Sequence, residues 1–519
     1  MVNLCGWLVL FAAVSANRLG ADAPKDTRPN IVFILVDDMG WSDPGCYGHP
    51  WHQTPAIDAL AATGVRFTDA YSPAPICSAA RAAFLTGRYP ARLGFEFVTK
   101  DDPGDQRIDA ETELRAPPLT LELPLEEQTM AESLGDLGYQ TAFFGKWHVA
   151  RHHEHYLGWH PQFGPDSQGF SVTFESFGSH PYGWRKDAVP KTSPREGTFP
   201  GDALFDACVE FIASEHGRPF FCFLSTYHVH TPVQCNVPWL LKKYQSIVPR
   251  DAVNRGERIR YAAFMEILDH QIGRVLGALD RPTNGRDTMV VFTSDNGGHP
   301  IFTDNGPLRG SKWNLYEGGI RVPAIVRWPK RVDAGVIDRQ PIHGVDWHST
   351  LVSVAGGDPS PKVDGAVPSV LRSSTPPTAK QESRHASNTN ATRVETEDVV
   401  AVFGIQPQDR PLIWHFPYYH PETGFAQALP KIGNTDFAVS KTRPHSAIRW
   451  GRWKLLWFAE DGRRELYDLE ADLEEQQDLA SEHPGLADRL ENELSRRLLS
   501  MNARMPTRDG NAVTISATP

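Results

Sequence analysis

The stretch NIVFILVDD at residues 30–38 decides the fold. Its consecutive apolar residues leave neither face polar, so they predict a strand buried on both faces, and two acids follow it directly. Three later apolar runs have the same form and also end in polar residues. They are Thr141 to Phe144 before Lys146 and His148, Phe220 to Leu224 before His228 and His230, and Met289 to Thr293 before Asp295 and Asn296.

Helical patterns separate these strands. The clearest are Pro55 to Thr63, Thr129 to Leu137, Asp202 to Ser214 and Arg258 to Leu279. Strands that alternate with helices predict an α/β fold, in which helices sandwich a large, mostly parallel sheet. Because ligands bind beyond the carboxyl ends of the strands in such sheets, we expect the polar residues after the four strands to converge at one edge.

The sequence pattern divides the chain into four parts after the N-terminal segment. They are a main domain over residues 28–355, an irregular insertion or linker over 356–411, a C-terminal subdomain over 412–500 and a disordered tail over 501–519. The subdomain is expected to be a smaller antiparallel sheet that carries a helix. Its strands are Ile448 to Trp450, Lys454 to Phe458 and Arg464 to Tyr467, with a turn at Asp461 and Gly462, and its helix presents Leu486, Leu490, Leu494 and Leu498 on one stripe.

The apolar run Leu8 to Ala16 is too short to span a bilayer but is typical of a signal peptide, which we place at residues 1–23. The alternative is a frayed N-terminus, because no Lys or Arg precedes the run. We expect export to the medium or the periplasm, and no membrane span. Cys208 falls on an apolar helix face, whereas Cys46, Cys222 and Cys235 are left open as disulfide partners.

The formal net charge of −11 argues against a nucleic-acid partner, since phosphate contacts need a clustered excess of Lys and Arg. An anionic substrate must therefore be bound by a local pocket.

Two pairs of oxygen-bearing residues end predicted strands: Asp37 with Asp38, and Asp295 with Asn296. Adjacent buried acids are costly without a cation. Hard oxygen ligands without a thiolate suit calcium or magnesium better than zinc, and outside the cell calcium is favoured. The alternative is that each pair caps a following helix.

The segment PICSAARAAFLTGR at residues 75–88 places Cys77 at the start of a predicted helix, with Arg81 one turn later. A helix N-terminus and a guanidinium both favour an anion. From the residues alone, Cys77 is either a thiolate nucleophile of low pKa or a structural cysteine in an Ala-rich helix.

This segment resembles the signature of the sulfatase family, Cys-x-Pro-Ser-Arg followed by Leu-Thr-Gly. Ala79 and Ala80 replace the Pro and Ser, which leaves open which maturation system accepts the variant. The resemblance implies that a formylglycine-generating enzyme oxidises Cys77 to formylglycine, whose hydrate is the nucleophile and a calcium ligand. Arg81 then holds the reacting group.

Other segments resemble the family in the same chain order, so the resemblance implies that residues 28–355 are a catalytic sulfatase domain. The resemblance implies that Asp37, Asp38, Asp295 and Asn296 bind the metal, that Lys146 and Lys312 bind sulfate, that His148 faces the formylglycine and that His230 protonates the leaving alcohol. The segments are residues 30–40, GKWH at 145–148, HVHTP at 228–232, SDNG at 294–297, RGSK at 309–312 with YEGGIRVP at 316–323, and LYDL at 466–469.

The substrate is expected to be a sulfated small molecule or polysaccharide. Carbohydrate sulfate is favoured over aryl or steroid sulfate, mainly because export without a membrane anchor suits a polymer-degrading enzyme. Aromatic and basic residues suit a sulfated sugar site, and the alternative for them is a packed loop with surface histidines. These aromatic and basic residues are His152, His153, His155, Trp159, His180, Trp184 and Arg185 in one loop region, and Trp414, His415 and Tyr418 as a further wall. Two alternatives remain: a phosphoesterase of the related alkaline phosphatase-like fold, and a non-catalytic binder of sulfated glycans that leaves Cys77 unoxidised.

Overall fold

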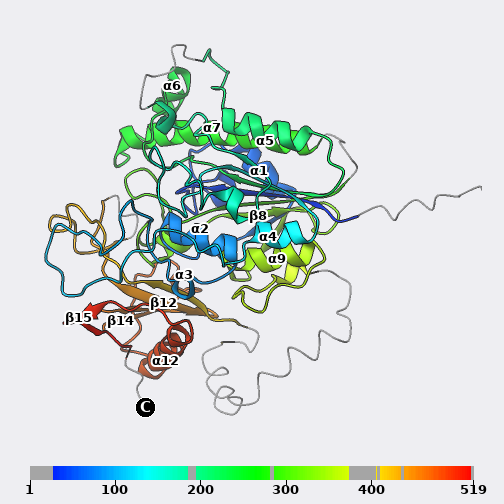
Figure 1. Cartoon of the computed structure of the whole chain (residues 1–519). Helices are drawn as coiled ribbons and strands as arrows, with labels where there is room; N and C mark the ends of the chain where they lie inside the picture. Colours follow the sequence, from blue (N-terminus) through cyan, green and yellow to red (C-terminus); the bar gives the residue numbers. More distant parts are fainter. Residues whose placement is uncertain are drawn as a thin grey trace, which may run out of the picture.

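The computed structural model describes residues 27–184, 194–280, 286–372, 405, 409–433 and 438–515. Its centre is an eight-stranded sheet in the order β5-β4-β6-β1-β7-β8-β2-β9 (Figure 1). The strands are β1 (Asn30–Val36), β2 (Val65–Phe67), β4 (Gln140–Gly145), β5 (Val172–Phe174), β6 (Phe220–Ser225), β7 (Thr288–Ser294), β8 (Ala324–Arg327) and β9 (Val336–Asp338). A separate two-stranded sheet pairs β3 (Ala70–Tyr71) with β10 (Ile342–His343).

The middle of the large sheet is parallel. Strand β1 pairs with both β6 and β7, so that Ile31 lies opposite Phe221 on one side and Met289 on the other. Only β8 runs antiparallel to its neighbours β7 and β2. The predicted α/β class with a mostly parallel sheet is confirmed.

Helices cover both faces of this sheet (Figure 1). On one face lie α1 (Pro55–Ala62), α5 (Ala203–Ala213), α6 (Pro238–Ile247) and α7 (Arg255–Leu279), and on the other lie α2 (Cys77–Thr86), α4 (Met130–Asp136) and α9 (Asp346–Val354). Strand periodicity divides β1 between them: Phe33 packs with the core beneath α2 and α9, whereas Val32 and Ile34 pack with the core beneath α5 and α7. Shorter helical segments are α3 (Pro90–Leu93), α8 (Glu317–Ile320), η1 (Gly45–Tyr47), η2 (Pro165–Gln168), η3 (Pro181–Trp184) and η4 (Ser369–Leu371).

The C-terminal subdomain is a four-stranded antiparallel sheet covered by one helix. Its elements are β11 (Leu412–Phe416), β12 (His445–Trp450), β13 (Trp453–Phe458), β14 (Arg464–Asp468) and α12 (Pro484–Ser500). Gly462 turns the β13–β14 hairpin in the left-handed conformation, with a φ of 69°. The predicted leucine stripe of α12 is fully buried.

Two predictions for the C-terminal part are wrong. Trp414, His415 and Tyr418 do not form a wall of a sugar site: all three are buried, and the Trp414 indole donates to the Ser72 carbonyl at 2.8 Å. Aromatic residues of a packed strand and of a binding wall look alike in sequence. Here their burial shows that these residues belong to the packed core.

The tail predicted to be disordered from residue 501 is ordered up to residue 515. It forms a hairpin of β15 (Thr507–Arg508) and β16 (Asn511–Ala512), and Thr507 exchanges backbone hydrogen bonds with Arg115. Ile515 is buried beside α12. Backbone pairing and apolar burial explain the order.

Several sequence predictions fall on other parts of the chain. The signal peptide at 1–23, residues 373–404 and 406–408 of the insertion, and residues 516–519 lie outside the described residues. No described helix has the length and apolar character of a membrane span. The described cysteines are all free thiols, with the sulfur atoms of Cys208 and Cys222 3.6 Å apart.

A buried ion network joins the C-terminal sheet to helix α8. The Lys454 ammonium of β13 lies 2.8 Å from a carboxylate oxygen of Glu317 and 2.8 Å from one of Glu475. Glu317 also contacts Arg321 at 2.9 Å. Because Glu317 begins α8, five residues after Lys312, the network fixes the segment that carries a predicted sulfate-binding lysine.

Replacing Lys454 by Met should destabilise the protein by about 3–5 kcal/mol, because two buried carboxylates would lose their shared cation. Urea unfolding followed by tryptophan fluorescence measures the change. The exposed Lys362→Met variant is the control and should stay within about 0.5 kcal/mol of wild type. A Lys454→Met variant as stable as this control would show that the network contributes nothing.

Candidate functional site

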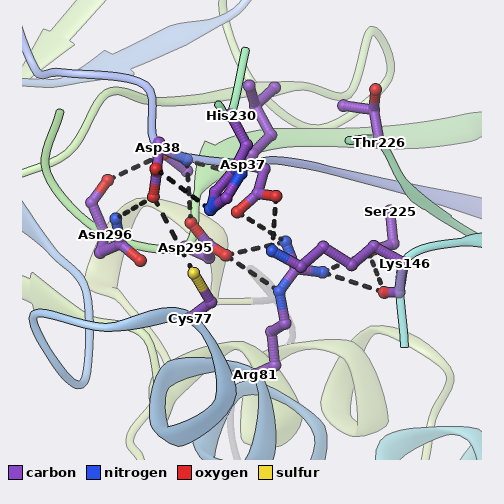
Figure 2. A network of polar contacts seen from close by, with 12 residues as sticks. Asp37, Asp38, Cys77, Arg81, Lys146, Ser225, Thr226, His230, Asp295 and Asn296 are labelled. Atoms are coloured by element: carbon purple, nitrogen blue, oxygen red, sulfur yellow. Dashed lines mark hydrogen bonds and ion pairs between the residues drawn. The ribbon is translucent and has the colours of Figure 1, made fainter. Parts of the chain in front are cut away.

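The predicted metal ligands lie together at the carboxyl end of the large sheet. Asp37 and Asp38 follow β1, Asp295 and Asn296 follow β7, and the pairing of Val36 with Ser294 sets the two pairs side by side. The Asp38 amide donates to Asp295 Oδ1 at 3.1 Å, and the Asn296 side chain donates to Asp38 Oδ1 at 2.7 Å (Figure 2). All four side chains are buried.

Cys77 is the first residue of α2 and points at this cluster from below (Figure 2). Its sulfur lies 3.9 Å from Asp38 Oδ1. Burial raises the pKa of the Cys77 thiol to about 12, although Lys146 and Lys312 oppose the shift. As an unmodified cysteine it is therefore protonated at neutral pH, and the low-pKa thiolate considered from the sequence is wrong.

Arg81 lies one turn after Cys77 and is also buried. Its guanidinium contacts Asp295 Oδ2 through Nε at 2.9 Å and through Nη2 at 2.7 Å, and Nη2 lies 3.5 Å from Asp37. Its Nη1 donates to the Ser225 hydroxyl at 2.5 Å and to the Lys146 carbonyl at 3.0 Å. The side chain is thus held in one orientation by groups at the ends of four strands, β1, β4, β6 and β7.

Two buried lysines complete the positive side of the site. The Lys146 ammonium lies 2.6 Å from Asp37 Oδ2, and that of Lys312 lies 2.7 Å from Asp38 Oδ1. Burial is the largest single influence and lowers the pKa of Lys312, but Asp38, Cys77 and Asp37 together outweigh burial and raise it. Gly145 permits the turn into Lys146, because its φ is 99° and a Cβ there would lie 2.2 Å from the Ser225 carbonyl.

The two predicted catalytic histidines flank the cluster. His230 Nε2 lies 3.6 Å from Asp38 Oδ2, and its Nδ1 lies 2.5 Å from the Thr231 carbonyl and 3.0 Å from the Tyr182 hydroxyl. Burial lowers the pKa of His230 to about 3.

His148 is buried with a φ of 57°, and neither ring nitrogen has a hydrogen-bond partner in the described part of the chain. Burial, and then the Lys146 charge, lower the pKa of His148.

The predicted metal, sulfate-binding and catalytic residues all lie in one region of the structure. One ligand atom from each of Asp37, Asp38, Cys77 and His230 lies within 4.8 Å of the others.

The predicted sugar-binding loop contributes less than the sequence indicated. His180 is fully buried and bonds the His230 carbonyl at 2.9 Å, so it positions His230 and does not reach a substrate. The Trp159 indole donates to the Gly145 carbonyl at 3.0 Å. His152 is half-buried, 5.7 Å from the His148 ring, while His153 and His155 are more peripheral. The Trp184 side chain and Arg185 lie outside the described residues.

Sequence reasoning missed Ser225 and Tyr182. Ser225 ends β6, accepts from Arg81 and donates to the Lys146 carbonyl at 2.6 Å. Its place at the end of a strand beside β1 and β4 was the available signal. Tyr182 reaches His230 from the short helix η3, and no sequence pattern indicates that contact.

Comparison with known proteins places this site in context. A profile of the sulfatase family matches residues 29–357. The chain is 33% identical to N-acetylgalactosamine-6-sulfatase of Canis lupus familiaris over 69% of this chain and 68% of that protein. It is 29% identical to a sulfatase of Formosa agariphila over 96% of this chain and 94% of that protein.

The fold is also similar to that of solved structures. Ps i-CgsB, solved in complex with k-i-k-neocarrahexaose, superposes with a TM-score of 0.64 at 22% identity and covers 94% of this chain and 95% of that one. The likeness covers most of this chain and shows that the two share a fold.

Proposed function

We propose that this chain, which belongs to the sulfatase family and hydrolyses sulfate esters, is an exported enzyme for sulfated carbohydrates. In this proposal a formylglycine made from Cys77 is its nucleophile and calcium is its metal. The observation that carries the proposal is one buried cluster that contains Cys77 at a helix N-terminus, oxygen ligands from β1 and β7, and the cations Arg81, Lys146 and Lys312.

The oxygen atoms of the cluster fit a hard cation. Asn296 Oδ1 is buried and has no hydrogen-bond partner among the described residues, and the buried Asp37 Oδ1 makes only a 3.5 Å ion pair with Arg81, so both oxygens are available to an ion. Asp37, Asp38, Asp295 and Asn296 would hold calcium together with the formylglycine made from Cys77, whose sulfur position lies 3.9 Å from Asp38 Oδ1. When bound, calcium and the formylglycine hydrate supply positive charge and the attacking oxygen, respectively.

The three cations of the site suit a sulfate group. Lys146 follows β4, Lys312 lies in the segment before α8, and Arg81 lies in α2. Their three positive charges balance the negative charges of the three aspartates. Negative charge on the sulfate oxygens increases as the ester bond breaks, so fixed cations stabilise the transition state more than the ground state.

The two histidines have different proton-transfer roles in this proposal. His230 protonates the departing alcohol, and Tyr182 and His180 hold its ring and backbone in place. His148, neutral because of burial, accepts the proton whose removal lets sulfate leave after the alcohol has gone. A base with no competing hydrogen bond is available for that step.

Carbohydrate sulfates are proposed as the substrates because of the relatives and the sequence. One relative is named N-acetylgalactosamine-6-sulfatase, and Ps i-CgsB was solved in complex with k-i-k-neocarrahexaose. The apolar run in residues 1–23 supports export, which suits degradation of a polymer.

The test compares matched esters and examines Cys77 directly. Purified protein from the native source should hydrolyse 4-nitrophenyl sulfate far faster than 4-nitrophenyl phosphate, and peptide mass spectrometry should find formylglycine at position 77. A preference for the phosphate would favour the phosphoesterase. Only unmodified Cys77, together with binding of sulfated sugars without turnover, would favour the binder.

Removal of calcium should lower both the activity and the melting temperature, the latter by a few degrees. An ion that binds only the folded state stabilises it by mass action, and its loss leaves Asp37, Asp38 and Asp295 close together. Chelation with EGTA followed by differential scanning calorimetry measures the shift, and added calcium should restore both properties. An unchanged melting curve in protein shown by elemental analysis to be calcium-free would contradict the proposed metal site.

A further inference from the structure

Three aromatic side chains beside the sulfate-binding residues have no role in the chemistry above: Trp313, His299 and His420. Trp313 directly follows Lys312, and its amide donates to the Pro75 carbonyl at 2.8 Å, two residues before Cys77. Lys312 is buried whereas the Trp313 side chain is half-exposed. Trp313 therefore lies between the buried site and the solvent.

The three rings pack on one another although they come from separate segments. The Trp313 and His420 rings are stacked, with centroids 3.9 Å apart and planes 19° apart. His299, which follows β7, meets the Trp313 ring edge to face at 4.9 Å. His420 belongs to the C-terminal subdomain, where backbone hydrogen bonds of 3.0 and 2.7 Å to Thr442 fix it. The packing therefore places the C-terminal subdomain next to the active site.

The backbone also holds Trp313 in an unusual conformation. Its φ is 80°, in the left-handed region that bulky residues rarely adopt. Such conformations persist where the surrounding structure enforces them, and they gather at ligand-binding sites.

These rings retain unused polar groups. Trp313 Nε1 and the ring nitrogens of His420 make no hydrogen bond to any residue that the structure describes. His299 uses only Nδ1, which accepts from the Ile301 amide at 3.2 Å. The partly exposed Trp313 ring carries His420 on one face, and the Lys312 ammonium lies 5.5 Å from its centroid. An aromatic ring with donors and acceptors at its edge matches a pyranose ring, which has apolar C–H groups on its face and hydroxyls around its edge.

We propose that Trp313, stacked on His420 and contacted by His299, forms the subsite that binds the sugar ring bearing the scissile sulfate. Trp313 provides the stacking surface, and the two histidines provide hydrogen bonds to the hydroxyls. The neighbouring Lys312 binds the sulfate group. The ester oxygen then links this sulfate group to the sugar ring that stacks on Trp313. The inference rests on the proposed function and specifies its substrate contacts.

Binding to full-length protein that carries Cys77→Ala tests the subsite without turnover. The probes for titration calorimetry are N-acetylgalactosamine 6-sulfate, a carrageenan tetrasaccharide and inorganic sulfate. Adding Trp313→Ala should weaken binding of whichever saccharide the parent binds more tightly by about tenfold, and it should leave the affinity for inorganic sulfate unchanged. Trp313→Phe should restore most of the affinity, and His420→Ala should give an intermediate loss.

The control is Trp239→Ala, which should bind both probes normally, because this half-buried tryptophan of α6 packs on Phe199 and donates to the Thr198 carbonyl, outside the site. If Trp313→Ala lowers the affinities for saccharide and sulfate equally, Trp313 only supports Lys312. An unchanged saccharide affinity would contradict the proposed stacking role of Trp313. Failure of the parent to bind either saccharide would also overturn the subsite. Failure of the proposed function appears separately, as wild-type protein without sulfatase activity.

Discussion

Replacing Cys77 by Ala is expected to lower turnover of any sulfate ester by at least about a thousandfold, because the substitution removes the precursor of the nucleophile. Folding should be nearly unaffected. Cys77 is buried at the first position of α2, Ala79, Ala80, Ala82 and Ala83 follow it in the same helix, and Ala is a better helix former than Cys. Initial rates on 4-nitrophenyl sulfate and on a sulfated saccharide, together with circular dichroism and a melting curve, measure both effects.

The matched control is Cys235→Ala, which removes a thiol that is equally buried but lies outside the site. It should keep wild-type activity. Normal activity in a folded Cys77→Ala protein would eliminate the nucleophile, and with it the proposed reaction. A loss of activity accompanied by unfolding in both variants would instead trace the effect to the core.

The central fold could be predicted because its strands are apolar on both faces. The runs that became β1, β4, β6 and β7 have no polar interruption, and each is followed by residues that a parallel sheet must bring to one edge. The convergence of Asp37 with Asp295 follows from topology alone, because β1 and β7 are neighbours. The roles of Lys146, Lys312 and His230 depended on the family resemblance, since one buried lysine or histidine in a sequence looks like another.

The short strands and the burial of aromatic residues could not be predicted from the sequence. β2 and β9 each have three residues, too few for an alternation to be recognised, and the antiparallel β8 follows no helix pattern. The strand that contains Trp414 was mistaken for a wall of the site. The ionisation of Cys77 was also inaccessible: a helix N-terminus favours the thiolate, but complete burial beside Asp37 and Asp295 favours the thiol more strongly.

The position of His230 determines how it can act. The Thr231 carbonyl can only accept a hydrogen bond, so the Nδ1 beside it carries a proton. The other nitrogen, Nε2, faces Asp38 at 3.6 Å, and donation from it requires a doubly protonated ring. Burial opposes that charge, whereas Asp38 and an anionic sulfate ester favour it. His230 is thus suited to act as an acid once the substrate is bound.

Replacing His230 by Ala should therefore reduce hydrolysis of a sugar sulfate by about a hundredfold to ten-thousandfold, but hydrolysis of 4-nitrophenyl sulfate much less. A sugar alcohol is a poor leaving group that needs a proton, whereas nitrophenolate departs without one. The measurement is kcat/KM on both substrates. His148→Ala should behave differently, slowing both substrates alike and releasing about one equivalent of alcohol in a burst before turnover stalls, because its step follows departure of the alcohol.

His216→Ala is the control for loss of a buried histidine. His216 contacts Gln140 at the opposite end of β4 from Lys146, so both substrates should retain their wild-type ratio. Equal losses on the two substrates with His230→Ala would mean that His230 does not protonate the alcohol and that the Lys312 ammonium, which lies beside the same Asp38 carboxylate, is the acid instead. Absence of a burst with His148→Ala, in protein whose formylglycine content matches wild type, would show that His148 acts before the alcohol leaves.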